Sequence, residues 1–521
     1  MKKTIKINNG KFIEEREINY IPIRYILAIM LTLLEVLLII GIVGTLCYFF
    51  WWFKILVIIT QISVILTIIA SNDNPEYKIP WLLFVIILPI VGFMLYFLFY
   101  SRKLKKAFTK KLSKIQNEFK YEHDDFKIFE ELKNDNLTMY SQAKMLTDIA
   151  ETKLFKNTNQ KYLNIGEEYF ASLINDLKNA QKFIFMEYFI IAEGKFWNTI
   201  LDILKEKAKN GVIVKLIYDD IGCMSTLSGS YDKKLISLGI DTVIFSKLKG
   251  EADNKFNNRS HRKITVIDGI IGYTGGINIA DEYINNIKRF GHWKDIGIRI
   301  EGEGVYELTK QFLIDFNINS KKQLNLNIDL FPKTTIKNEG YVIPFGDGPR
   351  PLYKRRVSEN AIKNMINMAT KSIYITTPYL ICSDDLFLSL ENAALRGVDV
   401  SIITPHIPDK KLVYQMTKAN YLRLINAGVN IYEYELGFIH AKSYLVDDAV
   451  AIIGTINLDY RSLAHHFENG IWLYKCDSII DLKNDLIHTL EKSIKINKQD
   501  LKTSIFMRTI RSIIKIFSPL L

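Results

Sequence analysis

Hydrophobic residues dominate the first hundred positions of the chain, in three consecutive runs. Glu35 and Lys54 are the only charged residues between positions 25 and 70, and positions 81–100 carry no charge. Each run has about the 20 apolar residues that a helix needs to cross a bilayer. We therefore predict a membrane region over residues 1–100 with three transmembrane helices, at 25–47, 51–70 and 81–100.

The charges that flank these runs bear on orientation. A cluster of cations follows the last run: Arg102, Lys103, Lys105, Lys106, Lys110 and Lys111. Such clusters stay in the cytoplasm, so we expect a multi-pass protein of the cell membrane with a cytoplasmic catalytic body. The N-terminal tail is also basic, and three spans would place it on the opposite side. Either this tail crosses the membrane, or the first apolar stretch forms a re-entrant hairpin.

After the membrane region the pattern becomes that of an α/β body. Residues 101–160 are charged and weakly periodic, which indicates a connector with some helix. Amphipathic helices and apolar strands then alternate twice in the same order, at 168–180, 183–187, 196–209 and 212–218, and again at 361–369, 372–377, 386–395 and 398–404. This alternation predicts mixed, mostly parallel sheets flanked by helices. We expect two units, 161–335 and 336–500, joined near 320–350 into one pseudo-twofold body.

One pattern occurs in both halves. Each copy reads H-x-K-x-x-x-x-D, followed by a glycine and an asparagine at the same offsets: His261, Lys263, Asp268, Gly275 and Asn278, then His440, Lys442, Asp447, Gly454 and Asn457. Side chains two residues apart share one face of a strand, so each histidine points the same way as its lysine. Two such strands side by side would make one pocket with two histidines and two lysines.

These residue types suit the cleavage and transfer of a phosphodiester. One imidazole can attack phosphorus while the other protonates the leaving alcohol and then activates an incoming hydroxyl. Each lysine supplies fixed positive charge to the phosphate. The candidate catalytic residues are His261, Lys263, Asp268, His440, Lys442 and Asp447. The candidate phosphate- or substrate-binding residues are Asn278, Asn457, Gly275 and Gly454. A carboxylate that orients each ring is also expected, and the candidates are Glu468, Glu187 and Glu282.

The remaining histidines and the cysteines point to no metal site. Each motif histidine has a cationic lysine beside it and no second soft ligand, so we predict metal-independent chemistry without a cofactor. The four cysteines are scattered and are expected to be buried, reduced thiols: Cys47, Cys223, Cys382 and Cys476. We expect structural roles for His123, His406 and His488. Packing and site lining remain equal alternatives for His292, His465 and His466.

The net charge of +12 favours an anionic partner, either nucleic acid or anionic lipid. The duplicated pattern resembles the phospholipase D superfamily, and other stretches resemble its bacterial cardiolipin synthase branch. These stretches are Asp73 to Trp81, Tyr218 to Gly222, Gly275 to Tyr283, Thr377 to Tyr379, Gly437 to Lys442, Gly454 to Ser462, Phe467-Glu468 and the terminal Ser518 to Leu521. Two features depart from the branch: Phe316 stands where it usually has tryptophan, and the first apolar run exceeds its common two-span pattern.

The resemblance implies a phosphatidyltransferase that moves a phosphatidyl group from one phosphatidylglycerol to another and releases glycerol. Its partners would be phosphatidylglycerol, as donor and acceptor, and the anionic phospholipid membrane, without nucleic acid. The superfamily tendency makes His261 the nucleophile and His440 the acid and then the base. The alternatives are a phospholipase D hydrolase or another phosphatidyltransferase, a membrane-bound nuclease, and a non-catalytic lipid-binding scaffold. The oligomeric state stays open.

The last residues, 501–521, form a distinct tail. Apolar residues recur there at steps of four, three and four, with three cations between them: Phe506, Ile510, Ile513 and Phe517, then Arg508, Arg511 and Lys515. This pattern is typical of a basic amphipathic helix in the membrane interface, and a helix packed on the body is the alternative. We expect a chain that ends at Gln499 to keep its fold but to lose activity on anionic bilayers.

Overall fold

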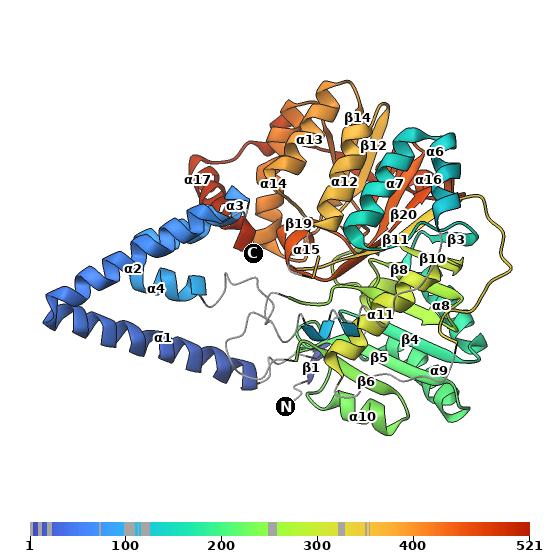
Figure 1. Cartoon of the computed structure of the whole chain (residues 1–521), viewed down its shortest axis with the longest axis horizontal. Helices are drawn as coiled ribbons and strands as arrows, with labels where there is room; N and C mark the ends of the chain where they lie inside the picture. The colour runs from blue at the N-terminus through green and yellow to red at the C-terminus, as the bar shows by residue number, and fades with distance from the viewer. Residues whose placement is uncertain are drawn as a thin grey trace.

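In the computed structural model of this protein, a pair of long helices projects from an α/β body with two halves (Figure 1). The structure describes residues 4–8, 13–17, 23–71, 74–97, 110–112, 114–115, 125–247, 258–320, 329–349, 352–353 and 355–520. The cations at 102–106, His123 and part of the connector lie outside these residues. A two-stranded antiparallel pair, β1 (Thr4–Asn8) and β2 (Ile13–Glu17), precedes the helices.

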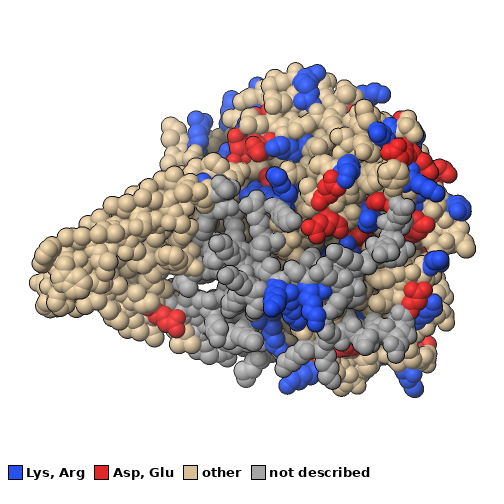
Figure 2. All heavy atoms as spheres, viewed as in Figure 1, with Lys and Arg blue, Asp and Glu red and all other residues tan. Residues whose placement is uncertain are grey.

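The projecting helices are α1 (Ile23–Phe49) and α2 (Trp51–Ala70), which form a hairpin that points away from the body. In the visible face of Figure 2, this hairpin is almost free of charged side chains, whereas charges are frequent on the body. Within the described residues, α2 is the one helix that is long and apolar enough to cross a membrane, and the apolar stretch Leu33–Phe49 is shorter.

The third predicted span, 81–100, does not form one continuous helix. It falls on α3 (Pro75–Ile87) and α4 (Pro89–Leu95), which are separated at Leu88. Leu88 has φ −125° and ψ 74°, outside the helical region. A proline disfavours helical geometry in the residue before it and favours the first position of a new helix, which explains the break before Pro89.

The first half contains a seven-stranded sheet with strand order β3-β10-β8-β7-β4-β5-β6. The strands are β3 (Thr158–Leu163), β4 (Phe183–Tyr188), β5 (Ile213–Asp219), β6 (Asp241–Phe245), β7 (Lys263–Ile267), β8 (Ile271–Gly275) and β10 (Gly297–Gly302). β4, β5 and β6 are parallel and the other neighbours antiparallel. The helices are α8 (Gly166–Asn179), α9 (Lys195–Lys209), α10 (Tyr231–Ser237) and α11 (Val305–Asn319), with the 3-10 helix η3 (Asp281–Ile284).

The second half contains an eight-stranded sheet with strand order β11-β20-β18-β17-β12-β14-β15-β21. The strands are β11 (Tyr341–Asp347), β12 (Ser372–Thr376), β14 (Asp399–Pro405), β15 (Asn430–Tyr434), β17 (Ser443–Val446), β18 (Val450–Gly454), β20 (Glu468–Tyr474) and β21 (Ser493–Lys495). The helices are α12 (Val357–Met368), α13 (Asp384–Leu395), α14 (Lys411–Asn426), α15 (Tyr460–Ala464), α16 (Ser478–Glu491) and α17 (Ile505–Ile516), with η4 (Lys498–Leu501) and η5 (Ser518–Leu520). The predicted pair of mixed α/β units is therefore confirmed. The prediction that the sheets are mostly parallel is wrong, because among the described strands only β4-β5-β6 and β12-β14-β15 pair in parallel and the other neighbours in both sheets are antiparallel.

The two sheets share a core. Alternate residues of β4 face opposite sides, and Phe185 stacks on Phe312 of α11 with ring centroids 4.7 Å apart. The same cluster contains Leu445 and Ile471 from the second sheet. Burying this apolar surface from both halves stabilises their association. The two units therefore form one body rather than two independently folded domains.

The described part of the connector packs on the body. Its helices α6 (Phe126–Asp135) and α7 (Leu137–Ala150) pack on the second half, next to α12 and β11 (Figure 1). The Trp472 indole of β20 donates to the Gln142 side chain of α7 at 2.7 Å. The segment before the first half thus completes the helical cover of the second half, which the predicted boundary at residue 160 did not anticipate.

Candidate active site

The two copies of the H-x-K pattern lie at equivalent places in the two sheets. Lys263 begins β7 and pairs with Tyr188 at the carboxyl end of β4. Ser443, which follows Lys442, pairs with Thr376 at the carboxyl end of β12. Ligand sites of parallel sheets form at the carboxyl ends of strands. The fold thus brings both copies to the edge of the sheet where such sites form.

Backbone pairing between the halves brings these edges together. The His261 N–H donates to the Phe467 carbonyl at 2.9 Å, and the Phe467 N–H donates to the Arg259 carbonyl at 2.9 Å. The short strand β16 (Gly437–Ile439) runs parallel to β9 (His292–Lys294), and the His440 N–H donates to the Lys294 carbonyl at 2.7 Å. Each histidine is therefore anchored to backbone of the other half.

A buried carboxylate of the second half contacts His261. Both carboxylate oxygens of Glu468 lie 3.0 Å from His261 Nδ1. The Ser462 hydroxyl donates to the same carboxylate at 2.6 Å, and the Thr455 hydroxyl also donates to it. Glu468 is thus the one of the three candidate carboxylates that the structure places on a motif histidine.

Burial lowers the pKa of His261 to about 3, although the charge of Glu468 acts in the opposite direction. Burial also tends to raise the pKa of Glu468, but His261 and His466 outweigh it and hold that pKa below its usual range. At neutral pH the pair is therefore a neutral imidazole that donates its Nδ1–H to an ionised carboxylate. This tautomer leaves the Nε2 lone pair available for attack.

The second histidine has its own carboxylate, which the sequence analysis missed. Asp295, between β9 and β10, lies 2.6 Å from His440 Nδ1 and is fully buried. Burial raises the pKa of Asp295 to about 7, although Lys442 acts to lower it. Burial and the nearby charges of Lys442 and Lys263 hold the pKa of His440 well below its usual range. Near neutral pH, a fraction of the Asp295 carboxyl groups is therefore protonated, whereas the Glu468 carboxyl group is ionised.

A sequence signal for Asp295 exists in the pattern acid-x-Gly. Asp295 stands two residues before Gly297, and Glu468 stands two residues before Gly470. Gly297 pairs with motif residue Gly275, and Gly470 pairs with Gly454. The two carboxylates are thus equivalent in the duplicated fold. Each comes from the half that does not contain its histidine.

The two lysines are fully buried beside the histidines. Lys263 Nζ donates to the His261 carbonyl at 2.7 Å, and Lys442 Nζ donates to the His440 carbonyl. Burial lowers the pKa of Lys263 to about 7 and that of Lys442 to about 8. Because the charge of Lys442 acts to lower the pKa of Lys263, and the charge of Lys263 acts to lower the pKa of His440, groups from both halves belong to one site.

These pKa values predict loss of activity on the alkaline side. The cationic form of Lys263 is present below pH about 7 and is lost above it, and the proton on Asp295 is lost over the same range. We expect kcat/KM for detergent-dispersed substrate to fall as the pH rises through 7 to 8. The profile should be measured on the full chain. A profile that stays level above this range would contradict these assignments.

The motif asparagines differ in their contacts. Asn278 accepts the Ile190 N–H at 3.0 Å and donates to the Tyr283 hydroxyl at 2.7 Å, so its amide already supports the fold. The buried Oδ1 of Asn457 has no hydrogen-bond partner among the described residues. A buried polar atom without a partner is unfavourable until a ligand or water satisfies it. Asn457 is therefore the one of the two asparagines whose side-chain oxygen can still accept a hydrogen bond, such as that of a substrate hydroxyl.

The motif glycines allow close backbone approach. A Cβ atom at Gly275 would lie 2.4 Å from the Ile296 carbonyl oxygen, and one at Gly454 would lie 2.3 Å from the Asn469 carbonyl oxygen. Only glycine allows β10 and β20 to pack at these positions. Since Ile296 and Asn469 directly follow Asp295 and Glu468 in the sequence, the glycines help to set where the two carboxylates sit.

The structure also corrects the roles predicted for Asp268 and Asp447. They directly follow β7 and β17, and each lies about 16 Å along the extended chain from its motif lysine. Asp268 accepts the N–H groups of residues 181–183 at 2.7–2.8 Å. Asp447 accepts those of residues 370–372 at 2.7–3.0 Å. They fix the turn that leads into β4 or β12, and they do not reach the histidines.

We therefore expect Asp447→Asn to affect stability more than chemistry. The amide replaces a carboxylate that accepts three backbone N–H groups and the Thr370 hydroxyl. Lost hydrogen bonds to a charged group cost about 1–3 kcal/mol. The thermal unfolding midpoint should fall while kcat per folded molecule stays within a few-fold of wild type. A large loss of kcat at unchanged stability would return Asp447 to the catalytic group.

Among the described residues, the other two candidate carboxylates, Glu187 and Glu282, form no hydrogen bond with a motif histidine. Glu187 is buried in β4 and accepts the Ser260 hydroxyl at 2.5 Å. Burial and the adjacent Asp315 raise the pKa of Glu187 well above its usual range. Glu282 in η3 forms an ion pair with Arg289 at 2.9 Å. Glu187 thus belongs to the buried scaffold, and the half-buried Glu282 pairs with an exposed arginine.

Among the other histidines, His466 lies nearest to the site. Its ring centroid is 5.6 Å from that of His261, and its Nδ1 is 3.8 Å from a Glu468 oxygen. The ligand atoms of these three residues lie within 4.8 Å of one another, a spacing that could hold a metal ion. The positive charge of Lys263, which acts on His261, opposes a cation there. The other side of the site is lined by Tyr283, whose ring centroid is 5.5 Å from that of His440.

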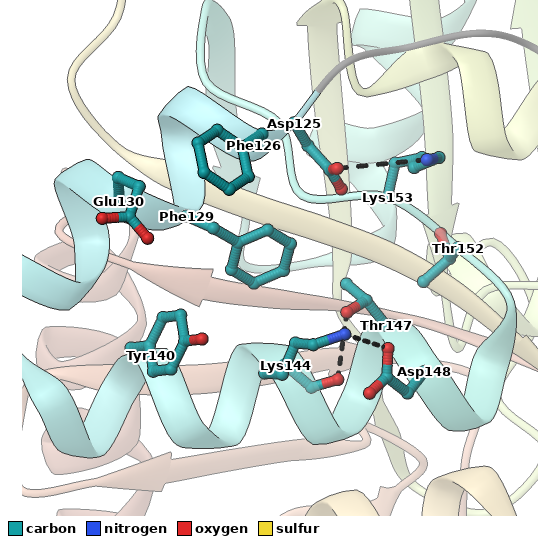
Figure 3. A pocket seen from close by; sticks show the side chains of 10 residues that line it. All are labelled: Asp125, Phe126, Phe129, Glu130, Tyr140, Lys144, Thr147, Asp148, Thr152 and Lys153. Carbon is teal, nitrogen blue, oxygen red and sulfur yellow. Dashed lines mark hydrogen bonds and ion pairs between the residues drawn. The ribbon is translucent and has the colours of Figure 1, made fainter.

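A separate pocket lies between α6 and α7 (Figure 3). It has a volume of about 350 Å³ and is lined by residues from 125 to 153. Two of its ion pairs, Lys144 with Asp148 at 2.5 Å and Lys153 with Asp125 at 3.9 Å, are partly exposed. This pocket belongs to the connector helices and contains none of the motif residues.

Comparison with known proteins agrees with the geometry. A family model described as cardiolipin synthase, PLD-like domain, matches residues 173–316 and 362–490. A second model, described as phospholipase D-nuclease N-terminal, matches residues 55–99. The crystal structure of phosphatidylserine synthase from Haemophilus influenzae has a TM-score of 0.55 at 14% identity, covering 73% of this chain and 98% of that chain. This likeness concerns the fold.

Sequence relatives extend over most of the chain. A cardiolipin synthase from Alkalihalophilus pseudofirmus is 36% identical over 484 residues, covering 90% of this chain and 95% of the relative. Cardiolipin synthase 2 from Bacillus cereus is 35% identical over 463 residues, covering 87% and 88%. An uncharacterized protein from Streptococcus mutans is 40% identical over 473 residues, covering 88% and 100%. With both halves matched and both histidine sites complete, the chain belongs to the cardiolipin synthase family of the phospholipase D superfamily.

Proposed function

We propose that this protein is a phosphatidyltransferase that makes cardiolipin and glycerol from two molecules of phosphatidylglycerol. The observation that carries the proposal is the pair of histidines, each with a buried carboxylate from the other half, in one site with two buried lysines. Two histidines allow the two steps of a covalent transfer. Two lysines match the negative charge of a phosphodiester.

In the first step, His261 Nε2 attacks the phosphorus of the donor lipid. A phosphorus–nitrogen bond forms, the bond from phosphorus to the glycerol oxygen breaks, and His440 gives its proton to that oxygen. Glycerol leaves with this proton. The positive charge that develops on the His261 ring is balanced by Glu468, 3.0 Å from Nδ1.

In the second step, His440 accepts the proton of the terminal hydroxyl of a second phosphatidylglycerol. The hydroxyl oxygen attacks phosphorus, the phosphorus–nitrogen bond breaks, and cardiolipin leaves with His261 restored. If water took the place of the lipid hydroxyl, the product would be phosphatidic acid. This hydrolysis is the alternative function.

The order of the two histidines follows from the difference between their carboxylates. The Glu468 carboxylate, with its lowered pKa, stays ionised and favours a nucleophilic neutral ring at His261. The pKa of Asp295, about 7, lets the pair with His440 hold an additional proton near neutral pH. The first pair is thus suited to attack and the second to proton donation.

The test of function uses membranes that contain the full chain and phosphatidylglycerol labelled in the headgroup. We expect the label to appear in both free glycerol and cardiolipin. Phosphatidic acid as the main lipid product would overturn the transferase in favour of the hydrolase. Cleavage of DNA without lipid turnover would overturn both.

We further propose that the hairpin of α1 and α2 anchors the body to the cytoplasmic face of the cell membrane, with more than one apolar segment in the bilayer. The exposed apolar side chains of both helices and the cations that follow the apolar region in the sequence support this placement. Both substrates are lipids with reacting groups at the headgroup level. An anchor therefore keeps the pocket within reach of them.

The tail helix α17 supports the same placement through one of its faces. The apolar stripe predicted for the tail does not lie on one environment. Ile510 and Phe517 are half-buried, whereas Phe506 and Ile513 are exposed. The inner side packs on the body, where Arg511 donates to the Gln415 side chain at 2.7 Å. The outer face is apolar and bordered by cations, so we propose that it lies in the membrane interface.

We expect the pair of substitutions Ile505→Asp and Phe506→Asp to lower activity on anionic bilayers several-fold while activity in detergent changes little. These side chains are 81% and 74% exposed, so the fold does not depend on them. Removal of all residues after Gln499 would also delete the contact of Arg511 and is less specific. Ile480→Asp, at a 62% exposed position on α16, is the matched control. Equal activity of all variants on bilayers would exclude a membrane role for this face.

A further inference from the structure

The segment that follows the hairpin of α1 and α2 contains residues that stabilise the N-terminal end of α3. Asn74 caps α3 by accepting the Glu76 N–H at 3.1 Å, and Pro75 occupies the first helical turn. Both residues are preferred at a helix start. This start fixes the direction of the next two side chains, Glu76 and Tyr77, which turn toward the second half of the body.

Glu76 and Tyr77 contact α15 and its neighbours. One Glu76 oxygen accepts the Asp384 N–H at 2.6 Å, and the other accepts the Tyr460 hydroxyl at 3.0 Å. Tyr77 is buried and meets the Tyr460 ring edge to face, with centroids 5.3 Å apart. The Arg356 guanidinium covers the Tyr77 ring at 4.6 Å. Glu76 and Tyr77 thus both contact Tyr460, the first residue of α15.

Helix α15 in turn holds the orienting carboxylate of the site. Ser462, in the middle of this five-residue helix, donates its hydroxyl to Glu468 at 2.6 Å. The same hydroxyl oxygen accepts the N–H of Asn457 at 2.9 Å. Glu468 then contacts His261 Nδ1 at 3.0 Å. A continuous series of contacts therefore leads from α3 to the ring that attacks phosphorus.

We propose that Glu76 and Tyr77 are positioning residues for the transfer reaction, coupling the seating of the membrane hairpin to the placement of the Glu468–His261 pair. The inference rests on the proposed role of His261. Short helices such as α15 have little stability of their own, so their position depends on tertiary contacts. Loss of the contacts between Glu76, Tyr77 and Tyr460 allows Ser462 to move, so that Glu468 loses one hydrogen-bond donor. The orientation of the His261 ring by Glu468 is then weaker.

The test measures the first step on the full chain with a phosphatidic acid ester of p-nitrophenol, whose release reports formation of the phosphohistidine. We expect Glu76→Gln to slow this release about tenfold with little change in KM. Tyr460→Phe, which removes one hydroxyl, should have a smaller effect in the same direction. Phe84→Leu is the matched control, because Phe84 contacts Phe517 of the tail and not α15.

A double-mutant cycle separates this role from general stabilisation. If Glu76 acts through Ser462, the effect of Glu76→Gln should largely vanish in a Ser462→Ala background, whereas Phe84→Leu should remain additive. Effects of Glu76→Gln and Ser462→Ala that multiply would overturn the proposal.

Hydrogen exchange of the full chain gives a readout that does not need activity. Glu76→Gln should increase exchange of the amides in residues 457–462, and Phe84→Leu should not. Unchanged exchange there would overturn the coupling even if the enzyme proved to be a hydrolase. Failure of transferase activity alone, with the exchange result as expected, would reject only the proposed function.

Discussion

We expect His440→Asn to release one equivalent of p-nitrophenol from the p-nitrophenyl ester of phosphatidic acid and then to stall. p-Nitrophenolate is a weak base and leaves without a general acid, so His261 can still attack. The second step needs a base at His440 to activate the acceptor. The phosphatidyl group should remain on His261, where peptide mapping of the acid-labile adduct locates it. Turnover of phosphatidylglycerol should fall by a factor on the order of 10⁴ or more.

His261→Asn should give no burst with the same ester, because the group that forms the covalent bond is missing. His488→Asn, at an exposed position on α16, controls for the loss of an imidazole and should retain normal turnover. A burst in His261→Asn with the adduct mapped to His440 would reverse the two roles. Bursts in neither variant would argue against a covalent intermediate.

Glu468→Gln and Asp295→Asn should each lower kcat by about 10²–10⁴-fold, as loss of an orienting carboxylate does in other histidine sites. Their pH profiles should differ. Asp295→Asn removes the group with the pKa of about 7 and should weaken the alkaline decline, whereas Glu468→Gln should retain it. The measurement is kcat against pH in detergent for both variants.

Glu282→Gln is the control for these two substitutions, because the half-buried Glu282 pairs with the exposed Arg289 and not with a motif histidine. Its kcat should stay within about two-fold of wild type, since the substitution removes a carboxylate of the same kind without touching either histidine pair. A loss in Glu282→Gln as large as that in Asp295→Asn would show that the orienting carboxylate of His440 has been misassigned.

The duplicated pattern predicted the histidines and lysines because it repeats at fixed spacing, and the alternation of helices and strands predicted two α/β units. Asp295 escaped prediction because its distance in sequence is not repeated. It follows Asn278 by 17 residues, whereas Glu468 follows Asn457 by 11. The short acid-x-Gly pattern that the two share becomes informative in the strand register, where Gly297 and Gly470 each pair with a motif glycine.

Other differences arise from tertiary contacts that a local pattern does not contain. Asp268 stands in register with the catalytic motif, but its φ of 54° places it in a turn where it accepts backbone N–H groups. The apolar run at 81–100 has the composition of a span, but Pro89 starts a new helix. The tail has the periodicity of a membrane-surface helix, yet its inner face also packs on the body through Arg511.

The exchange of carboxylates between the halves has a consequence for biosynthesis. Glu468 follows His261 by 207 residues, so at 5–20 residues per second the ribosome needs roughly 10–40 s to deliver it. During that interval the N-terminal half can fold beside the membrane with its histidine, its lysine and no orienting acid. We therefore expect a nascent or truncated chain to attack the phospholipids around it far more slowly than the complete chain, as for Glu468→Gln. Full reactivity requires translation past residue 468, which limits the damage that incomplete copies do to the host bilayer.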